Sequence, residues 1–395
     1  MKPLVERLRP RGALAWAFAA LGAVALLAAL GVTLTMLWLV DYDGIGRLGV
    51  FGLMFAPQLV VVALVALGVA IFARRKRALL AASAFGATFA LLSVMGAWPT
   101  VAQRAYAAES GATVSAASAF VPEISGYAAG ESVTYAVAPD GKGLLLDVWR
   151  ARGAPEGKLR PAIVKVHGGG WNHGSRGEGA KWTELFTALG YEVFDIDYRK
   201  PPPERWRDEV ADVKCAIGWV SANAVKYSVD PSRISVMGYS AGANLAMLAA
   251  FSMGNPMLPP SCPVDPVAIR AVVNFYGPSR MNKLYATTGS RRYVHAMMHA
   301  YIGGDPETYS GRYDLLSPFR HVTRRSPPTI TLHGEADRVV PAAQARLLHE
   351  AFEDAGAHHE IYLFPWADHG FDVIWGSFAT QTAREKIRAF LGKFG

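Results

Sequence analysis

Three long stretches without a charged residue, all in the first quarter of the chain, constrain its fold more than any other feature. They cover residues 13–40, 48–73 and 78–103. Each exceeds the roughly 20 apolar residues that a helix needs to cross a bilayer. Core helices of a water-soluble protein would not give three such runs in succession. We therefore predict that residues 1–107 form a membrane anchor with three transmembrane helices.

The charges that flank these runs predict an orientation. The sequence RRKR at 74–77 separates the second run from the third, the loop between the first two is DYDGIGR, and four basic residues precede the first run: Lys2, Arg7, Arg9 and Arg11. Lys and Arg are enriched in cytoplasmic loops. The N-terminus and the RRKR loop are therefore expected on the cytoplasmic side of the inner membrane. Three spans then put the remainder of the chain on the periplasmic or extracellular side.

The same partition explains the net charge of +8. Up to residue 107 the chain has ten Lys and Arg against three Asp and Glu, whereas the remainder has 30 against 29. The basic balance thus belongs to the membrane segment and not to a basic binding face. Nucleic acid is not expected as a partner, because the outer segment as a whole is close to neutral.

The part of the chain after the anchor divides into a linker and one domain. Residues 108–130 are rich in Ala, Ser and Gly and show neither helical nor strand periodicity, so they are expected to be a tether. From residue 131 to 395, a hairpin within 133–149 is followed by short apolar strands that alternate with helical patterns. These strands are expected at 162–166, 191–197, 233–238, 269–276, 328–334 and 360–366.

Such strands are typical of a parallel sheet that is covered by helices on both faces. The stretch 279–326 interrupts the alternation and is expected to be a small cap over the sheet. The two cysteines, Cys215 and Cys262, imply no disulfide framework. An oxidising compartment would permit a disulfide, but Cys215 lies in a helical pattern and is expected to be only a small buried apolar residue.

A candidate nucleophile lies where a strand passes directly into a helix. Gly238, Ser240 and Gly242 form a G-x-S-x-G pattern, which makes a sharp turn that presents the serine above the sheet. Serine needs an adjacent base to become a good nucleophile. The expected chain order in this architecture is serine, then acid, then histidine. His369, after the last strand, is the candidate base, and Asp337, in the loop before the next helix, is preferred as the acid over Glu335 and Asp368.

The sequence HGGGW at 167–171 follows the first expected parallel strand. Three successive glycines are costly in conformational entropy, so they indicate a need for bare backbone. The run lacks the Lys-Ser/Thr of a phosphate-binding loop and the spacing of a dinucleotide fingerprint.

The domain from about residue 130 onwards resembles the α/β-hydrolase fold, and in particular the hormone-sensitive-lipase-like and feruloyl-esterase-like (BD-FAE type) carboxylesterases. The resemblance is carried by HGGGW (167–171), DYRKPPPERWRDEVADV (197–213), DPSRISVMGYSAGANLA (230–246), HGEADRVVP (333–341) and DHGF (368–371). Tyr239 and Ala243 depart from the hormone-sensitive-lipase pattern, which has an acidic residue and a glycine there. These departures favour the feruloyl-esterase-like branch.

The resemblance implies a Ser240, His369 and Asp337 triad that cleaves a small-molecule, lipid or glycan ester without a metal or another cofactor. It also implies an oxyanion hole of backbone N–H groups from Gly169, Gly170 and Ala241. Substrate-binding positions would be His167, Gly168, Trp171 and Tyr239. Two alternatives stay open: a peptidase or amidase of the same fold, similar to arylformamidases, and a non-catalytic hydrolase-like binding module.

Overall fold

The structure is a computed structural model that describes residues 10, 12–37, 39–40, 43, 48–153 and 157–395. It forms two compact units. The helical unit comprises Met1–Glu123 with Gly376–Gln381, and the sheet unit comprises Ile124–Trp375 with Thr382–Gly395. The basic residues expected before the first span and most of the DYDGIGR loop lie outside the described residues.

Up to residue 123, the regular secondary structure that is described in the helical unit is helical. They are α2 (Ala13–Met36), α3 (Leu48–Met54), α4 (Ala56–Arg75), α5 (Leu79–Glu109) and α6 (Ala116–Phe120). Helices α2, α4 and α5 are long and apolar enough to cross a membrane. The second apolar run is divided between α3 and α4, and Pro57 lies in the first turn of α4, where its missing N–H costs no helical hydrogen bond. Helix α6 lies within the segment expected to be a tether.

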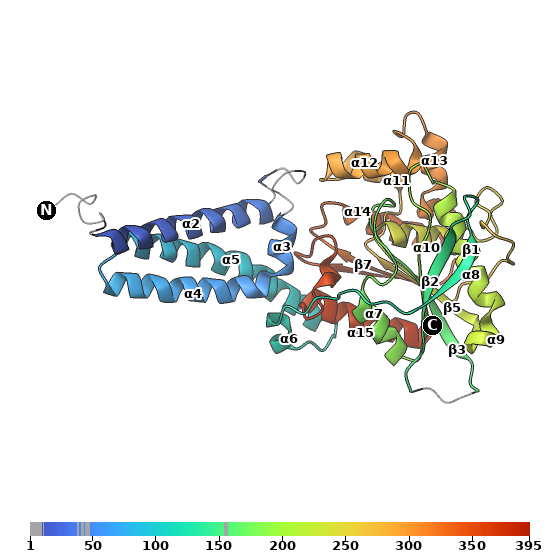
Figure 1. Ribbon diagram of the computed structural model, residues 1–395, viewed down its shortest axis with the longest axis horizontal. Coiled ribbons are helices and arrows are strands. Elements are labelled where there is room, and N and C mark those ends of the chain that lie inside the picture. Colours follow the sequence, from blue (N-terminus) through green and yellow to red (C-terminus); the bar gives the residue numbers. More distant parts are fainter. Residues whose placement is uncertain (1–9, 11, 38, 41–42, 44–47, 154–156) are drawn as a thin grey trace. The chain divides into compact units, whose positions relative to one another are not determined.

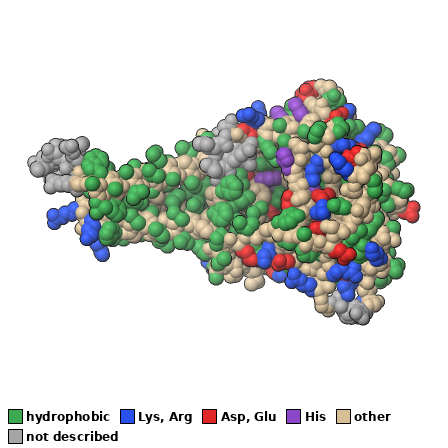
Figure 2. All heavy atoms as spheres, in the orientation of Figure 1, with side chains coloured by type: hydrophobic (Ala, Val, Ile, Leu, Met, Phe, Trp, Pro, Cys, Tyr) green, Lys and Arg blue, Asp and Glu red, His purple; other side chains and the backbone are tan. Residues whose placement is uncertain are grey.

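Small residues bring the long helices of this unit close together. A Cβ on Gly96 of α5 would lie 2.7 Å from the carbonyl oxygen of Ala56 in α4. Glycine and alanine allow this approach between membrane helices. Large apolar side chains such as Leu14, Leu27 and Trp98 are instead exposed, and Figure 2 shows hydrophobic side chains covering the face of the unit. A contiguous apolar surface of this kind is typical of contact with lipid or with a partner.

The sheet unit contains an eight-stranded sheet in the order β1-β2-β4-β3-β5-β6-β7-β8 (Figure 1). β1 pairs with β2 and β2 with β4 in antiparallel fashion, and all later pairs are parallel. Strands β4 and β7 are buried along their whole length, as expected for inner strands of a sheet that is covered on both faces. The strands are β1 (Glu131–Val137), β2 (Gly143–Trp149), β3 (Arg160–Val166), β4 (Glu192–Ile196), β5 (Val229–Tyr239), β6 (Val272–Phe275), β7 (Thr329–Gly334) and β8 (His359–Phe364).

Helices cover both faces of this sheet (Figure 1). Those that follow strands are α7 (Ala180–Ala188), α8 (Asp208–Ala222), α9 (Ala224–Tyr227), α10 (Ala241–Phe251), α14 (Ala343–Ala355), η3 (Phe371–Val373) and α15 (Phe378–Phe394). Between β6 and β7, where an insertion was expected, the chain forms α11 (Met281–Thr287), α12 (Arg291–Ile302), α13 (Ser310–Leu315) and η2 (Pro318–His321). We call these last four elements the cap segment.

Cys215 and Cys262 form a disulfide, so the expectation that Cys215 is merely a small buried residue is wrong. The loop after α10 folds back along α8, where Ser261 N–H donates to Ala211 O at 3.0 Å. Gly218 allows this approach, because a Cβ there would lie 2.4 Å from the Val264 side chain. Sequence periodicity places Cys215 on a buried helix face but does not reveal which distant loop packs against that face.

Candidate active site

Ser240 lies in a strained turn between the central strand β5 and helix α10. Its φ of 50° and ψ of −120° are unusual for a residue with a side chain. The flanking glycines are required by close backbone contacts: a Cβ on Gly238 would lie 2.3 Å from Gly242 O, and one on Gly242 would lie 2.1 Å from His167 O. The glycines of the G-x-S-x-G pattern therefore hold β3, β5 and α10 close together, and the turn projects the serine from the carboxyl end of the sheet.

His369 joins Ser240 to Asp337 through two hydrogen bonds. Its Nε2 lies 2.9 Å from Ser240 Oγ, and its Nδ1 lies 2.8 Å from Asp337 Oδ2. Asp337 follows β7 and His369 follows β8, so both loops lie at the end of the sheet from which Ser240 projects. The three residues that the sequence predicts as a triad are thus connected through His369.

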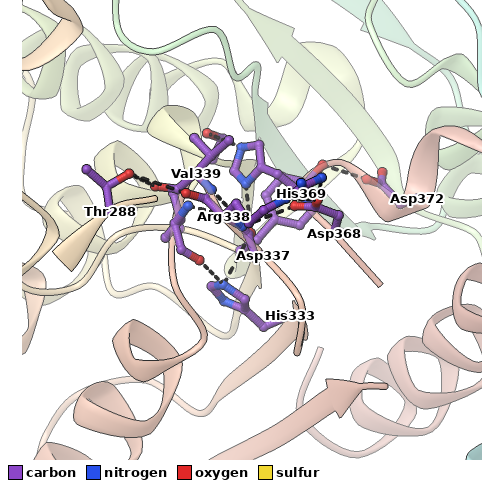
Figure 3. Close-up of polar contacts among 12 residues, drawn as sticks. Thr288, His333, Asp337, Arg338, Val339, Asp368, His369 and Asp372 are labelled. Carbon is purple, nitrogen blue, oxygen red and sulfur yellow. Dashed lines mark hydrogen bonds and ion pairs between the residues drawn. The ribbon is translucent and has the colours of Figure 1, made fainter. Parts of the chain in front are cut away.

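Backbone and side-chain contacts favour the ionised form of Asp337. The N–H groups of Val339 and Val340 donate to its Oδ1 at 2.9 and 2.8 Å, and His333 Nε2 lies 3.4 Å from its Oδ2 (Figure 3). Burial alone would raise the pKa of Asp337, but His369 and His333 outweigh burial and lower it.

For His369, burial would lower the pKa, but Asp337 and then Asp368 and Asp372 raise it above its ordinary value.

The two other acids that the sequence offered do not contact the histidine ring. Glu335 is exposed and pairs with Arg346 at 3.2 Å. Asp368 accepts a hydrogen bond from the backbone N–H of His369 at 2.7 Å and pairs with Arg338. Of the three candidate acids, Asp337 alone meets the imidazole.

The glycine loop after β3 has an unusual backbone. Gly169, Gly170 and Trp171 all have positive φ, at 106°, 60° and 61°. Gly168 lies against the nucleophile turn, since a Cβ there would be 3.5 Å from Ser240 Cβ. Among the described residues, the N–H groups of Gly169 and Gly170 donate no hydrogen bond. The loop that contacts the serine turn through Gly168 therefore contains two backbone N–H groups that donate to no described acceptor.

The remaining predicted substrate-binding side chains are buried. Trp171 is stacked on Tyr301 of α12 with ring centroids 5.0 Å apart. His167 is stacked on Tyr198 at 4.3 Å, and burial, with nearby lysines, lowers its pKa to about 3, so its ring is neutral. Tyr239 packs beside Phe275. Their assignment to substrate binding stays a prediction.

A partly buried ionic network connects the loop after β3 to the neighbouring strands, and the sequence analysis did not predict it. Arg176, in the same loop, donates from Nε to Asp147 of β2 at 2.8 Å and also pairs with Asp197 after β4. Lys165 of β3, fully buried, pairs with Asp195 of β4 at 2.9 Å. Charged residues inside otherwise apolar strands were the signal that could have revealed this network, because buried charges are paired.

Two further groups at the site were also not predicted. The ring of Tyr276 packs edge-on against the His369 ring, with ring centroids 4.7 Å apart. The Tyr276 hydroxyl donates to Asp372, which also accepts a hydrogen bond from Trp182 Nε1 at 2.9 Å. On the cap side, Met297 of α12 lies beside Gly170, where a Cβ would be 2.9 Å from its Cγ. The sequence contains no pattern that predicts how α12 packs against the glycine loop.

Within the described residues no group of three or more His, Cys, Asp or Glu side chains is arranged to hold a metal ion. The polar groups at the carboxyl end of the sheet are instead a serine, a histidine, carboxylates and backbone N–H groups. This set of groups is suited to nucleophilic attack with proton transfer.

Comparison with known proteins gives consistent similarities. Residues 146–352 match the BD-FAE family model. The chain is 34% identical to the esterase LipQ of Mycobacterium tuberculosis, over 64% of this chain and 60% of LipQ. It is 35% identical to LipC of the same organism, over 63% of this chain and 62% of LipC. It thus spans about three-fifths of the length of these curated relatives.

Among solved structures, a thermophilic esterase of Thermogutta terrifontis with propionate bound is similar, with a TM-score of 0.56 and 28% identity. The similarity covers 67% of this chain and 94% of that one. Together with the sheet order, these similarities confirm the predicted α/β-hydrolase fold.

Proposed function

The chain belongs to the BD-FAE family, and from this we propose that it is a serine hydrolase that cleaves carboxylic esters through Ser240, His369 and Asp337. The observation that carries the proposal is the position of His369, 2.9 Å from Ser240 Oγ and 2.8 Å from Asp337 Oδ2. A base needs this contact to take the serine proton, and it needs the second contact to hold the correct tautomer. A non-catalytic binding module would have no need for either geometry.

In the proposed acylation step, Ser240 Oγ attacks the ester carbonyl while its proton passes to His369 Nε2. Asp337 stabilises the imidazolium that results. The carbonyl oxygen becomes an oxyanion, and we expect the N–H groups of Gly169, Gly170 and Ala241 to bind it. Removing one such donor costs about 3–4 kcal/mol of transition-state stabilisation in enzymes of this type.

The tetrahedral intermediate then collapses, and the bond between the carbonyl carbon and the alcohol oxygen breaks. His369 gives its proton to the leaving alcohol, and the acyl group stays on Ser240. In deacylation, water attacks the acyl carbon and gives a proton to His369, and the carboxylic acid leaves as Ser240 regains its proton. No redox reagent or metal enters this balance.

Labelling with a fluorophosphonate tests this proposal directly. The full chain is expected to be labelled, and Ser240→Ala is expected to abolish labelling while the protein stays folded. Ser252, a buried serine in the sheet unit, offers a matched control, because Ser252→Ala should leave labelling intact. Labelling of the folded protein that does not depend on Ser240 would contradict the proposal.

The preference of the enzyme for acyl chain length can be measured with a series of esters that begins with short acyl groups. The similar Thermogutta esterase was solved with propionate, which supports short acyl esters as the first substrates to test. A series of p-nitrophenyl acetate, propionate, butyrate and longer esters, with the matching anilides, would separate esterase from amidase activity. Acetylated and feruloylated sugars would extend the series to glycan esters.

We further propose that the sheet unit lies on the outer side of the cytoplasmic membrane. The RRKR loop joins α4 to α5, and one span, α5, separates that loop from the sheet unit. A cytoplasmic RRKR loop therefore requires an outer sheet unit. The disulfide between Cys215 and Cys262 supports this orientation, because disulfides persist in oxidising compartments.

Fusion of alkaline phosphatase after residue 130 tests the orientation, since this reporter folds only outside the cytoplasm. An active fusion is expected. A second fusion within the RRKR loop, at residue 76, should be inactive at equal expression. The reverse pattern would place the sheet unit in the cytoplasm.

A further inference from the structure

One carboxylate ties together the two loops that carry the acid and the base. Asp368 Oδ1 accepts hydrogen bonds from the backbone N–H of Arg338 at 3.1 Å and of His369 at 2.7 Å. Its Oδ2 accepts from Arg338 Nε at 2.8 Å and Nη2 at 2.6 Å (Figure 3). Arg338 adjoins Asp337 in the loop after β7, and Asp368 adjoins His369 in the loop after β8.

The Arg338 and Asp368 pair is buried, with side chains 7% and 0% exposed. Buried pairs of this kind are strongly coupled, because removal of one partner leaves an uncompensated charge. The turn between α11 and α12 of the cap segment contacts the loop after β7. Thr288 Oγ1 donates to Val339 O at 3.0 Å, and Gly289 N–H donates to Arg338 O at 2.9 Å.

The pair also balances charge around His369. Three acids act electrostatically on His369, and each raises its pKa: Asp337, Asp368 and Asp372. Burial and the neighbouring Asp337 raise the pKa of Asp368, and the guanidinium of Arg338 opposes them. Without that cation, two carboxylates would compete for a proton beside the base.

We propose that Arg338 and Asp368 are a positioning pair, which holds the Asp337 loop against the His369 loop and offsets part of the charge of a second carboxylate near the base. The proposal rests on the proposed chemistry of Ser240, His369 and Asp337. Neither residue touches the reacting atoms, so both act through the triad.

Asp368→Asn in the full chain is the decisive variant. It removes the anion but leaves the Arg338 guanidinium, which cannot lose its proton. Loss of the Asp368 anion, while the Arg338 cation stays, disfavours the imidazolium, so the acid limb of kcat/KM should move to lower pH by about one unit. The double variant Arg338→Met with Asp368→Asn removes both charges. Its acid limb should return towards that of the wild type, because neither charge remains. Its kcat should stay low, because the hydrogen bonds between the two loops are still missing.

The surface pair of Asp314 and Arg320, 3.2 Å apart and about half exposed, provides the matched control. Asp314→Asn should leave the pH profile unchanged. Should Asp368→Asn not fold, Arg338→Lys keeps the charge but loses the guanidinium fork, so it should lower kcat without moving the acid limb. An unmoved acid limb in folded Asp368→Asn, even with lower kcat, would reduce the pair to a structural contact and overturn the proposal.

A second measurement separates this proposal from the proposed function. The His369 ring pKa can be followed by NMR in the histidine-labelled full chain and assigned with His369→Asn. A wild-type chain without Ser240-dependent hydrolysis would refute the esterase chemistry. The ring pKa in Asp368→Asn would still decide the charge coupling: a downward shift supports it, and no shift overturns it.

Discussion

At the scale of single residues, the glycines of the HGGGW loop serve different purposes. A Cβ on Gly169 would lie 2.3 Å from the backbone oxygen of His173, whereas one on Gly170 would meet the flexible side chain of Met297 at 2.9 Å. We expect Gly169→Ala to lower both stability and turnover. Gly170→Ala should cost about 1–2 kcal/mol of stability for its positive φ and should mainly reduce kcat/KM. Denaturation midpoints and initial rates measure both effects, and equal stability losses would contradict the distinction.

The pH dependence of hydrolysis is also decided at single residues. His369 accepts the Ser240 proton only when its ring is neutral, so activity is lost as pH falls through the histidine pKa. Asp337, Asp368 and Asp372 outweigh burial and raise that pKa above 6.5. The acid limb of kcat/KM should therefore have its midpoint above 6.5, and a rate profile over pH would check it. A midpoint below that value would show that burial dominates.

The catalytic candidates could be predicted from the sequence because each follows a strand in an order that the architecture requires. Ser240, Asp337 and His369 all have such local signals. Arg338 and Asp368 had none, since their pairing depends on how two loops separated along the chain meet in space. Asp368 was visible only as a competitor for the role of acid, and the structure gives it a different partner.

At the scale of elements, the disulfide joins α8 to the loop after α10. It closes a loop of 47 residues, and the chain-entropy model predicts about 4 kcal/mol of stabilisation for that length. The Cys215→Ala, Cys262→Ala variant should unfold at a clearly lower denaturant concentration than the oxidised wild type. Reductant should lower the midpoint of the wild type only, and identical midpoints without reductant would contradict the prediction.

The packing of α4 against α5 is a second property of elements. Gly96 has no room for a side chain beside Ala56, whereas a Cβ on Gly86 of the same helix would meet nothing within 4 Å. Gly96→Val should therefore destabilise the helical unit by about 1–3 kcal/mol through overpacking, while Gly86→Val serves as the control. Thermal unfolding in detergent compares the two, and equal effects would mean that the helices do not pack closely there.

Element positions were predicted well where an apolar run had a single explanation. The parallel strands were expected within a few residues of β3 to β8, because burial on both faces leaves an almost uninterrupted apolar sequence. The second apolar run was different, since Pro57 divides it into α3 and α4. The docking of α12 beside Gly170 depends on side-chain fit across a long sequence separation and left no periodic signal.

For the whole molecule, the distribution of apolar surface makes a prediction about where the protein is found. The exposed large apolar side chains include many on α2, α4 and α5, and charged side chains are more frequent on the sheet unit in Figure 2. We expect the full chain to sediment with membranes after alkaline carbonate washing and to be released by detergent. Recovery in the soluble fraction would contradict an integral anchor.

The order of the triad along the chain has a consequence for when activity can arise. Ser240 and Asp337 are translated before β8, and His369 only after it. A ribosome-bound chain therefore lacks its base until all eight strands have been synthesised, whatever part has already folded. If α2, α4 and α5 insert as they emerge from the ribosome, the nascent polypeptide reaches its destination before it can hydrolyse anything. On the proposed chemistry and orientation, cytoplasmic esters would therefore meet no complete triad while the chain is being synthesised.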